Sequence, residues 1–214
     1  MNRRSTSKLL RVAAIAAAIA AAVLVTLLLV GRSMLRAEPA WWERAAPAAG
    51  PVAAERLENH VVSDASGVRP LTRDGAELVS EPFTITIDEA EANAWLVTRL
   101  GEWLRSRGVA ERFEDVRVSF EPGEVRVGAR IDGGRTAWAS VPTPVREGDD
   151  PLAHAAFYLG RVPVPRSVVL EAIQGARTPP PVVRIDEARS MRILKVEAGK
   201  GVLTVTARHV AEAE

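Results

Sequence analysis

The sequence predicts an α+β protein with one N-terminal transmembrane helix followed by a single domain, in which a curved, mainly antiparallel sheet packs on a long helix and two shorter helices. Three observations predict this fold class. Residues 12–30 form an apolar run without charge or proline. Several later segments alternate between apolar and polar residues and are joined by short turns, as in antiparallel strands. Other segments repeat apolar residues at three- and four-residue spacing, which is typical of helices packed on a sheet.

The apolar run at residues 12–30 is long enough to span a membrane. At about 1.5 Å of rise per residue it matches a hydrocarbon core about 30 Å thick. A buried core helix is an alternative, but such a helix is rarely apolar on every side with basic flanks. A cleaved signal peptide is another alternative. Signal peptides have a shorter apolar region than this one, and the stretch LRA at residues 35–37 is a poor cleavage site. We therefore expect an uncleaved signal anchor.

Basic residues predict the orientation of this anchor. Arg3, Arg4, Lys8 and Arg11 lie in the basic N-terminus at residues 1–11, whereas Arg32 and Arg36 follow the apolar run. Because basic flanks are retained in the cytoplasm, we expect a cytoplasmic N-terminus and an extracytoplasmic C-terminal domain. The predicted location is the cell membrane, with a single pass, and the membrane is the first predicted partner.

Residues 31–51 are predicted to form a linker, because they are rich in alanine and proline. The extracytoplasmic α+β domain is then expected to comprise residues 52–214. Trp41 and Trp42 lie within the linker and have two interpretations. They could lie at the level of the lipid headgroups, as interfacial tryptophans do, or pack on the domain. The sequence does not separate these two interpretations.

The first half of the domain begins with a short helix and continues with a strand and a long helix. Pro51 suits the first position of the short helix. Residues 79–87 contain the alternating stretch FTITI and predict a strand. Asp88 is the expected N-cap of the long helix, and Glu91, three residues later, suggests a variant capping box. The helix is expected to end near Gly108.

The second half of the domain is predicted to be mostly strands. VRVSF and EVRVGARI flank the turn EPGE and predict a hairpin. A third strand follows Gly134, and the segment LAHAAFYLGRVPVP predicts a further strand, with a helix around Ala153 to Tyr158 as the alternative. A short helix is expected to begin at Pro165. The final segment, from Val182 to Val210, predicts two or three strands, with a turn at residues 199–201.

Composition and motifs argue against several classes of function. The chain has no cysteine, which excludes disulfides and thiolate metal sites, and its net charge of +1 makes nucleic acid an unexpected partner. His60, His154 and His209 are isolated, and no metal-binding spacing, phosphate loop or dinucleotide motif occurs. We therefore assign no catalytic residue, metal site or cofactor, and we do not expect an enzyme. An envelope glycan or lipid hydrolase is the residual alternative.

The long helix carries the candidate binding surface. One interpretation is that its apolar face simply packs on the sheet. The functional interpretation is an apolar groove suited to an acyl chain, with Arg99 at its edge either reaching a headgroup or forming a surface salt bridge. Asn93 is expected to fasten the helix to neighbouring backbone, and Glu89 and Glu91 to favour the helix N-terminus electrostatically. The candidate groove residues are Trp95, Leu96, Arg99, Leu100, Trp103 and Leu104.

Three motifs resemble a known group of proteins. These are TITIDEAEANAWL with Asn93, GRVPVP at residues 160–165, and GVLTV at residues 201–205. With these motifs the chain resembles small membrane-anchored envelope proteins of the YpmS type and the wider group of tubular lipid-binding-like domains. The resemblance implies a long, strongly curved antiparallel sheet around the long helix, and contact with lipid. The prolines at 142, 144 and 179–181 depart from that pattern, because they interrupt strands of such a sheet.

The expected function follows from these observations. The sequence predicts a single-span, membrane-anchored extracytoplasmic protein of the bacterial cell envelope that binds a lipid or another amphiphile in an apolar groove. The alternative is a tethered structural or interaction module of an envelope complex, with a protein partner and no small-molecule ligand. A groove larger than packing requires would favour the first. A solid core with an exposed apolar patch would favour the second.

Overall fold

The structure is a computed structural model of the 214-residue chain. It describes residues 25–45, 50–67, 69–75, 77–106, 113–131, 134–173, 182–184 and 190–212. Within these ranges, the side chains of residues 101–106, 113–114, 170–173, 182–184 and 212 are not described. Most of the predicted transmembrane helix at residues 12–30 therefore lies outside the described residues. No helix in the described ranges has both the length and the hydrophobicity needed to cross a membrane.

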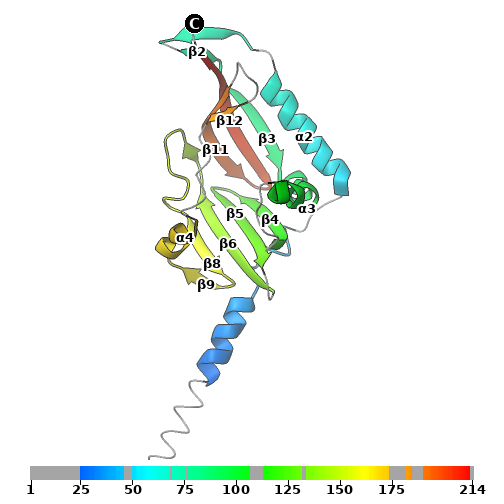
Figure 1. Cartoon of the computed structure of the whole chain (residues 1–214), viewed down its shortest axis with the longest axis vertical. Coiled ribbons are helices and arrows are strands. Elements are labelled where there is room, and N and C mark those ends of the chain that lie inside the picture. Colours follow the sequence, from blue (N-terminus) through cyan, green and yellow to red (C-terminus); the bar gives the residue numbers. More distant parts are fainter. Residues whose placement is uncertain are drawn as a thin grey trace, which may run out of the picture.

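The described chain is elongated (Figure 1). A helix over residues 25–36 lies at one end, and two antiparallel sheets, A and B, follow along the long axis. Helix α2 (Gly50–Ser66) runs beside sheet A, and helix α3 (Glu89–Ser106) lies where the two sheets meet. The short helix α4 (Arg166–Ile173) lies beside sheet B.

Sheet A is formed mainly by the C-terminal part of the chain. Its centre is the hairpin of β11 (Ser190–Gly199) and β12 (Val202–Glu212). One half of β12 pairs with β3 (Phe83–Asp88) and the other half with β2 (Glu77–Ser80). The remaining strands are β1 (Leu71–Asp74), which pairs with β2, and β7 (Val145–Arg146) and β10 (Val182–Arg184), which pair with β11.

Sheet B has a simpler topology, with the strand order β4-β5-β6-β8-β9 and antiparallel pairing throughout. Short turns join β4 to β5, β5 to β6 and β8 to β9, whereas the longer connection from β6 to β8 contains β7 of sheet A. The hairpin predicted at the turn EPGE is confirmed. The strands are β4 (Phe113–Glu121), β5 (Glu124–Ile131), β6 (Arg135–Pro142), β8 (Ala156–Leu159) and β9 (Val162–Val164).

The two sheets are joined where their hairpin turns meet. Gly201, in the β11–β12 turn, donates its backbone N–H to the carbonyl of Phe120 at 2.8 Å, and Gly123 donates to the carbonyl of Ala198 at 3.0 Å. Glu89, the first residue of α3, donates its N–H to the carbonyl of Gly201 at 2.9 Å. The start of α3 is therefore held at the junction of the two sheets.

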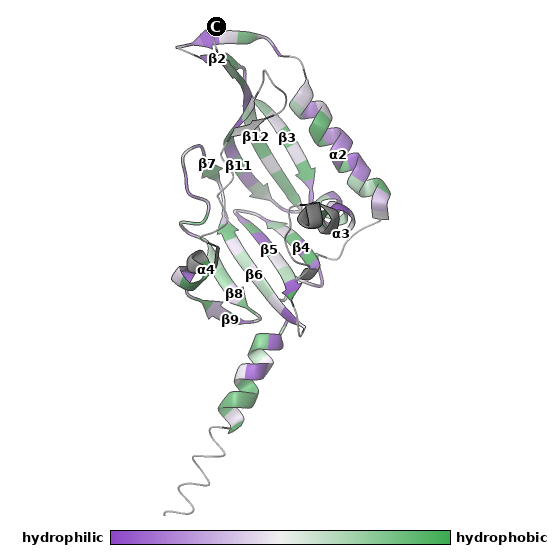
Figure 2. Cartoon of the chain, in the orientation of Figure 1, coloured by the Kyte–Doolittle hydropathy of each residue, from purple (hydrophilic) through white to green (hydrophobic). Residues whose placement is uncertain are grey.

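The main buried cluster lies between sheet A and α2. Phe83, Ile85, Met191 and Ala207 form it, and side chains of α2 pack against them. His209 is buried at its edge, where its Nε2 lies 2.6 Å from the carbonyl oxygen of Ala65 in α2. The apolar face of sheet A is therefore covered by a helix. Figure 2 shows the alternation of hydrophobic and hydrophilic residues along the strands that this packing requires.

The predicted α+β class with antiparallel strands is confirmed, but two details of the prediction are wrong. The strands form two sheets instead of one curved sheet, because the chain pairs separately on the two sides of the junction at Gly123 and Gly201. Helix α2 is not short: it has 17 residues, against 18 in α3. Near the prolines that depart from the resemblance, β6 ends at Pro142, and the Thr143–Pro144 peptide bond is cis.

Candidate functional site

The start of α3 fastens helix to sheet. Asp88 is the N-cap, as predicted, since its Oδ1 accepts a hydrogen bond from the N–H of Ala90 at 2.8 Å. Glu89 instead reaches sheet B, where its Oε2 accepts the N–H of Phe120 at 2.6 Å. Its carboxylate therefore accepts a hydrogen bond from a backbone N–H on the outer side of β4, the edge strand of sheet B. Glu91 pairs with Arg56 of α2 at 3.5 Å. The acids at this joint are thus explained by structural contacts.

Asn93 makes the central contact of this joint. Its side chain is 1% exposed. Its Nδ2 donates to the carbonyl of Val118 at 2.9 Å, and its Oδ1 accepts the N–H of the same residue at 2.9 Å. The amide therefore pairs with β4 as a neighbouring strand would. The predicted role of Asn93 as a fastener to neighbouring backbone is confirmed.

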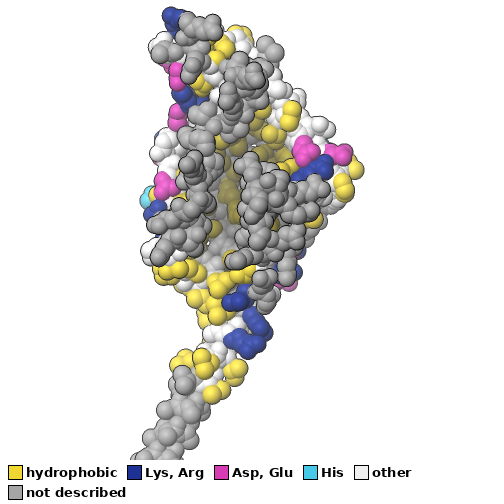
Figure 3. Space-filling view, viewed as in Figure 1, with side chains coloured by type: hydrophobic (Ala, Val, Ile, Leu, Met, Phe, Trp, Pro, Cys, Tyr) yellow, Lys and Arg dark blue, Asp and Glu magenta, His cyan; other side chains and the backbone are white. Residues whose placement is uncertain are grey.

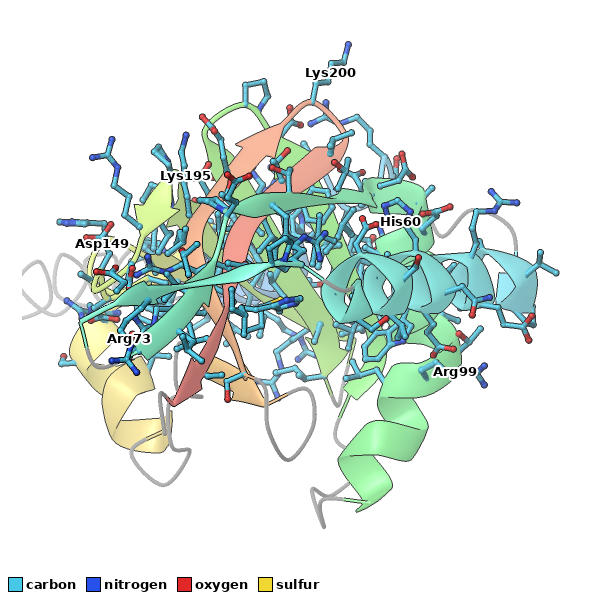
Figure 4. The ribbon with its side chains drawn as sticks, turned by 90° about the horizontal axis from the view of Figure 1, so that it is seen from above. His60, Arg73, Arg99, Asp149, Lys195 and Lys200 are labelled. Atoms are coloured by element: carbon cyan, nitrogen blue, oxygen red, sulfur yellow. The ribbon has the colours of Figure 1, made fainter. Side chains whose placement is uncertain are left out.

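The predicted groove residues on α3 do not all face the same surroundings. Trp95 packs on Ala53 and Ala54 of α2, and its Nε1 donates to Oε1 of Glu58 at 3.0 Å. Arg99 donates to the same oxygen at 3.1 Å, which makes the surface salt bridge that was the alternative to a headgroup contact. These two residues thus fix α3 to α2, and Figure 4 shows Arg99 on that side of α3.

The remaining residues of the predicted groove are two partly exposed leucines and two residues whose side chains are not described. Leu96 and Leu100 are partly exposed. The side chains of Trp103 and Leu104 lie outside the described residues. Trp95 and Arg99 therefore lie in the contact between α3 and α2. The prediction that these two residues line a groove is not supported.

A more extensive apolar surface lies on one face of sheet B. The register aligns apolar residues of successive strands in three rows, which we call the apolar face. The rows are Phe120, Val125 and Val141; Val118, Val127, Ala139, Phe157 and Val164; and Val116, Ala129, Ala137, Leu159 and Val162.

The apolar face is incompletely covered. Among its residues, Phe120 is buried, whereas Val127, in the middle row on β5, is 40% exposed and the others are partly exposed. Seen from above, α3 and α4 project from the same side of the sheets (Figure 4). Figure 3, viewed from that side, shows hydrophobic side chains over sheet B and within a hollow at the centre of the view. This differs from sheet A, whose apolar face packs on α2.

The opposite face of sheet B is polar and carries a docked segment of the chain. Residues 39–45, which we call the Trp segment, pack here through Trp41 and Trp42, which are 3% and 1% exposed. Trp41 meets Trp138 of β6 edge-on at 6.0 Å between ring centroids. Arg117 of β4 lies over the ring of Trp42 and donates to its carbonyl at 2.8 Å. Of the two interpretations of these tryptophans, packing on the domain is confirmed.

Two glycines make this docking sterically feasible. A Cβ at Gly128 would lie 2.9 Å from Cζ3 of Trp42 and 3.1 Å from Cη2 of Trp41. A Cβ at Gly160 would collide with the carbonyl oxygens of Met34 and Leu35, at the end of the helix over residues 25–36. The neighbouring N–H of Arg161 donates to the Met34 carbonyl at 2.9 Å, which satisfies one free carbonyl at this helix end. The predicted linker is therefore partly an element of the fold.

Charged groups on the polar face are paired. The Arg126 guanidinium donates to Glu124 at 2.6 Å, and the hydroxyl of Ser140 donates to the same carboxylate. The hydrogen bond from Arg126 lowers the pKa of Glu124, against an opposing effect of desolvation, and Ser140 lowers it further. In sheet A, Arg192 likewise lowers the pKa of Glu77 through a hydrogen bond of 2.6 Å.

No chemical site emerges among the described residues. The three histidines stay apart: His60 contacts Asp64 on α2, His154 lies in a turn, and His209 contacts the backbone of α2. In the described ranges, no cluster of three or more histidine, aspartate or glutamate side chains is placed to hold a metal ion. The apolar face was missed as a site, although the alternation in β4, β5 and β6 could have indicated it.

Comparison with protein-family models, with curated proteins and with solved structures found no match for this chain.

Proposed function

We propose that the protein is a membrane-anchored extracytoplasmic domain that binds the acyl chain of a lipid or of another amphiphile on the apolar face of sheet B. The observation that carries this proposal is the three-row apolar surface with Val127 of its middle row exposed. The proposal relocates the expected groove from α3, where Trp95 and Arg99 are engaged by Glu58, to the sheet.

The composition of the apolar face favours an acyl chain over a protein partner. Its three rows contain aliphatic residues and phenylalanine, without a polar side chain. Protein–protein interfaces are typically only about 56–65% apolar and include polar groups that fix the partner's orientation. A hydrocarbon chain needs no hydrogen-bonding partner, and a concave apolar surface is the usual site for such a ligand.

The attachment of the domain also supports this proposal. The apolar run at residues 12–30 is suited to span the membrane, and the helix over residues 25–36 reaches sheet B directly. Because the Trp segment then packs on the opposite face of the same sheet, sheet B is the part of the domain held next to the anchor. The apolar face would thus lie near a supply of lipid.

Photocrosslinking in native membranes tests the ligand. Cells producing the full chain are fed a diazirine-labelled fatty acid, irradiated, and the crosslinked peptides are identified by mass spectrometry. We expect crosslinks in β5 and β8. Val127→Asp should abolish them, because a charge on this face disfavours a hydrocarbon chain. Val97→Asp is the matched control, since Val97 is an exposed valine of α3.

Two results would contradict the lipid proposal. Crosslinks confined to the apolar helix at residues 25–30 would indicate bulk bilayer lipid. Crosslinks that persist in Val127→Asp would place the lipid elsewhere. If no lipid is captured, and a bifunctional protein crosslinker added to a parallel sample joins sheet B to another protein, the tethered interaction module is the better description.

The predicted orientation has its own test, which uses the absence of cysteine from the chain. A single cysteine at Ser66, an exposed residue at the end of α2, is treated in intact cells with a membrane-impermeant maleimide. Labelling before lysis supports an extracytoplasmic domain. Labelling only after lysis contradicts it.

A further inference from the structure

The helix over residues 25–36 has two chemically different parts. Consecutive residues of a helix point about 100° apart, so residues 27–30 together surround the helix axis. These residues, Leu27, Leu28, Leu29 and Val30, are all apolar and at least half exposed. A helix that is apolar on all sides without protein neighbours is suited to lipid. The next two turns carry Arg32 and Arg36, so the helix changes from wholly apolar to basic after Val30.

A third arginine from a distant part of the sequence joins these two arginines. Arg135, the first residue of β6, lines the same hollow as Arg32 and Arg36. The hollow has a volume of about 600 Å³, and its remaining lining consists of leucines and Gly31. A Cβ at Gly31 would meet no atom within 4 Å, so the space beside the helix is open.

The positive charges of this hollow are not neutralised by the described residues. No ion pair in the described part of the chain involves Arg32, Arg36 or Arg135. The nearest acid in sequence, Glu38, pairs with Arg130 at 2.5 Å. Three like charges around one space repel one another, and an anion between them would relieve that repulsion.

We propose that Arg32, Arg36 and Arg135 bind the phosphate of an anionic phospholipid headgroup where the anchor helix leaves the bilayer. The apolar residues of the preceding turn would contact the acyl chains of the same lipid, which favours a lipid over free phosphate. Guanidinium groups suit this role because each can donate two parallel hydrogen bonds to a phosphate. This inference rests on the proposed membrane attachment but not on lipid binding at the apolar face of sheet B.

The packing of Trp41 and Trp42 also helps to position the three arginines. Their burial holds the chain against sheet B just after the helix, and the Arg161 N–H holds the Met34 carbonyl. Arg135 is therefore kept beside the helix by the fold. A flexible linker would not bring it there.

The test uses the full chain reconstituted in phosphatidylcholine vesicles with a small fraction of spin-labelled phosphatidylglycerol or phosphatidylcholine. Electron paramagnetic resonance measures how strongly each lipid associates with the protein. We expect a preference for phosphatidylglycerol. An arginine close to an anionic lipid surface contributes about fivefold to association, so Arg135→Gln should reduce the preference about two- to fivefold.

Arg73→Gln is the matched control, because Arg73 is an exposed arginine of β1, at the other end of the molecule from the helix. It should leave the preference unchanged, and Arg135→Lys should retain most of it. A preference that Arg135→Gln does not alter, or no preference at all, overturns the headgroup site. If the chain is extracted from vesicles by alkaline carbonate, the membrane attachment itself fails, and the headgroup site fails with it.

Discussion

Asn93 of α3 and Val118 of β4 are joined by two hydrogen bonds, through which one side-chain amide pairs with both backbone groups of an edge residue. An edge strand presents unpaired N–H and C=O groups that can recruit another chain. Here the long helix occupies those groups with Asn93 and, two residues further along the strand, with Glu89. The joint between helix and sheet is thus specified by side chains that accept and donate like a strand.

Replacing Asn93 tests this pairing. Asn93→Leu should lower the free energy of unfolding by about 2–4 kcal/mol, because it removes both hydrogen bonds and leaves the N–H and C=O of Val118 unsatisfied near a buried position. Urea unfolding followed by circular dichroism measures the change. Asn59→Leu, at an exposed asparagine of α2, should change the stability by less than about 0.5 kcal/mol. Equal effects of the two substitutions would disprove the assigned role of Asn93.

Gly128→Ala tests the close approach of the Trp segment. The added methyl group would lie within about 3 Å of the rings of Trp41 and Trp42, so the segment must shift. We expect a loss of about 1–3 kcal/mol and a red shift of tryptophan emission as the rings become more exposed. Gly31→Ala is the control, since its Cβ meets no atom within 4 Å. A Gly128→Ala protein with unchanged emission would show that the rings accommodate a methyl group.

The boundary of the folded domain is a third prediction. A chain that begins at Val52 lacks the Trp segment, whereas one that begins at Ala37 retains it. Truncating one buried tryptophan to alanine costs about 3–5 kcal/mol, which is a large part of the 5–15 kcal/mol that stabilises a typical domain. We therefore expect the shorter chain to unfold at much lower urea concentration or to aggregate. Identical midpoints for the two chains would mean that the Trp segment contributes nothing to stability.

The pH dependence of stability is a fourth prediction. The folded-state pKa of Glu124 lies below its unfolded value, chiefly through the hydrogen bond from Arg126. The resulting stabilisation is therefore present above the unfolded pKa of about 4.3 and is lost as the pH falls through the folded pKa. Glu124→Gln should be less stable than the natural chain at pH 7, by at most about 1 kcal/mol for a partly exposed pair, and the difference should shrink as the pH falls through the folded-state pKa of Glu124.

Glu81→Gln serves as the control for that measurement, because the carboxylate of Glu81 is exposed and accepts no hydrogen bond from the described residues. Its effect on the free energy of unfolding should be small. A Glu124→Gln effect that persists unchanged below the folded-state pKa of Glu124 would show that the lost contribution is not the ionised pair with Arg126.

Local sequence patterns predicted many of the elements. The alternation of FTITI, VRVSF and EVRVGARI predicted β3, β4 and β5, since side chains of a strand point to opposite faces in turn. The cap at Asp88 was also predicted, because it depends on residues two apart in sequence. The fastening role of Asn93 was predicted from its place at the joint, whereas its partner Val118, 25 residues away, is shown only by the structure. The division into two sheets was not predicted, because it depends on which strands pair across long stretches of the chain, such as β3 with β12 and β7 with β11.

The surroundings of the candidate site on α3 also depend on contacts between distant parts of the chain. The apolar spacing on α3 suggested a groove around Trp95 and Arg99, but the spacing carries no information on which element a helix face meets. Glu58 of α2 engages both side chains. The exposure of Val127 depends on which elements cover the apolar face of sheet B, and that coverage is decided only when the whole chain is packed.

By itself the sequence determined the α+β class with antiparallel strands and the local contacts at the start of α3, because periodicity and capping act over a few residues. Only the tertiary structure decided the position of Trp41 and Trp42. Alanine and proline around them have the composition of a linker, yet Gly128 leaves room on sheet B for both rings. The burial of two large aromatic side chains on that surface outweighs the local preference for an extended, solvated linker.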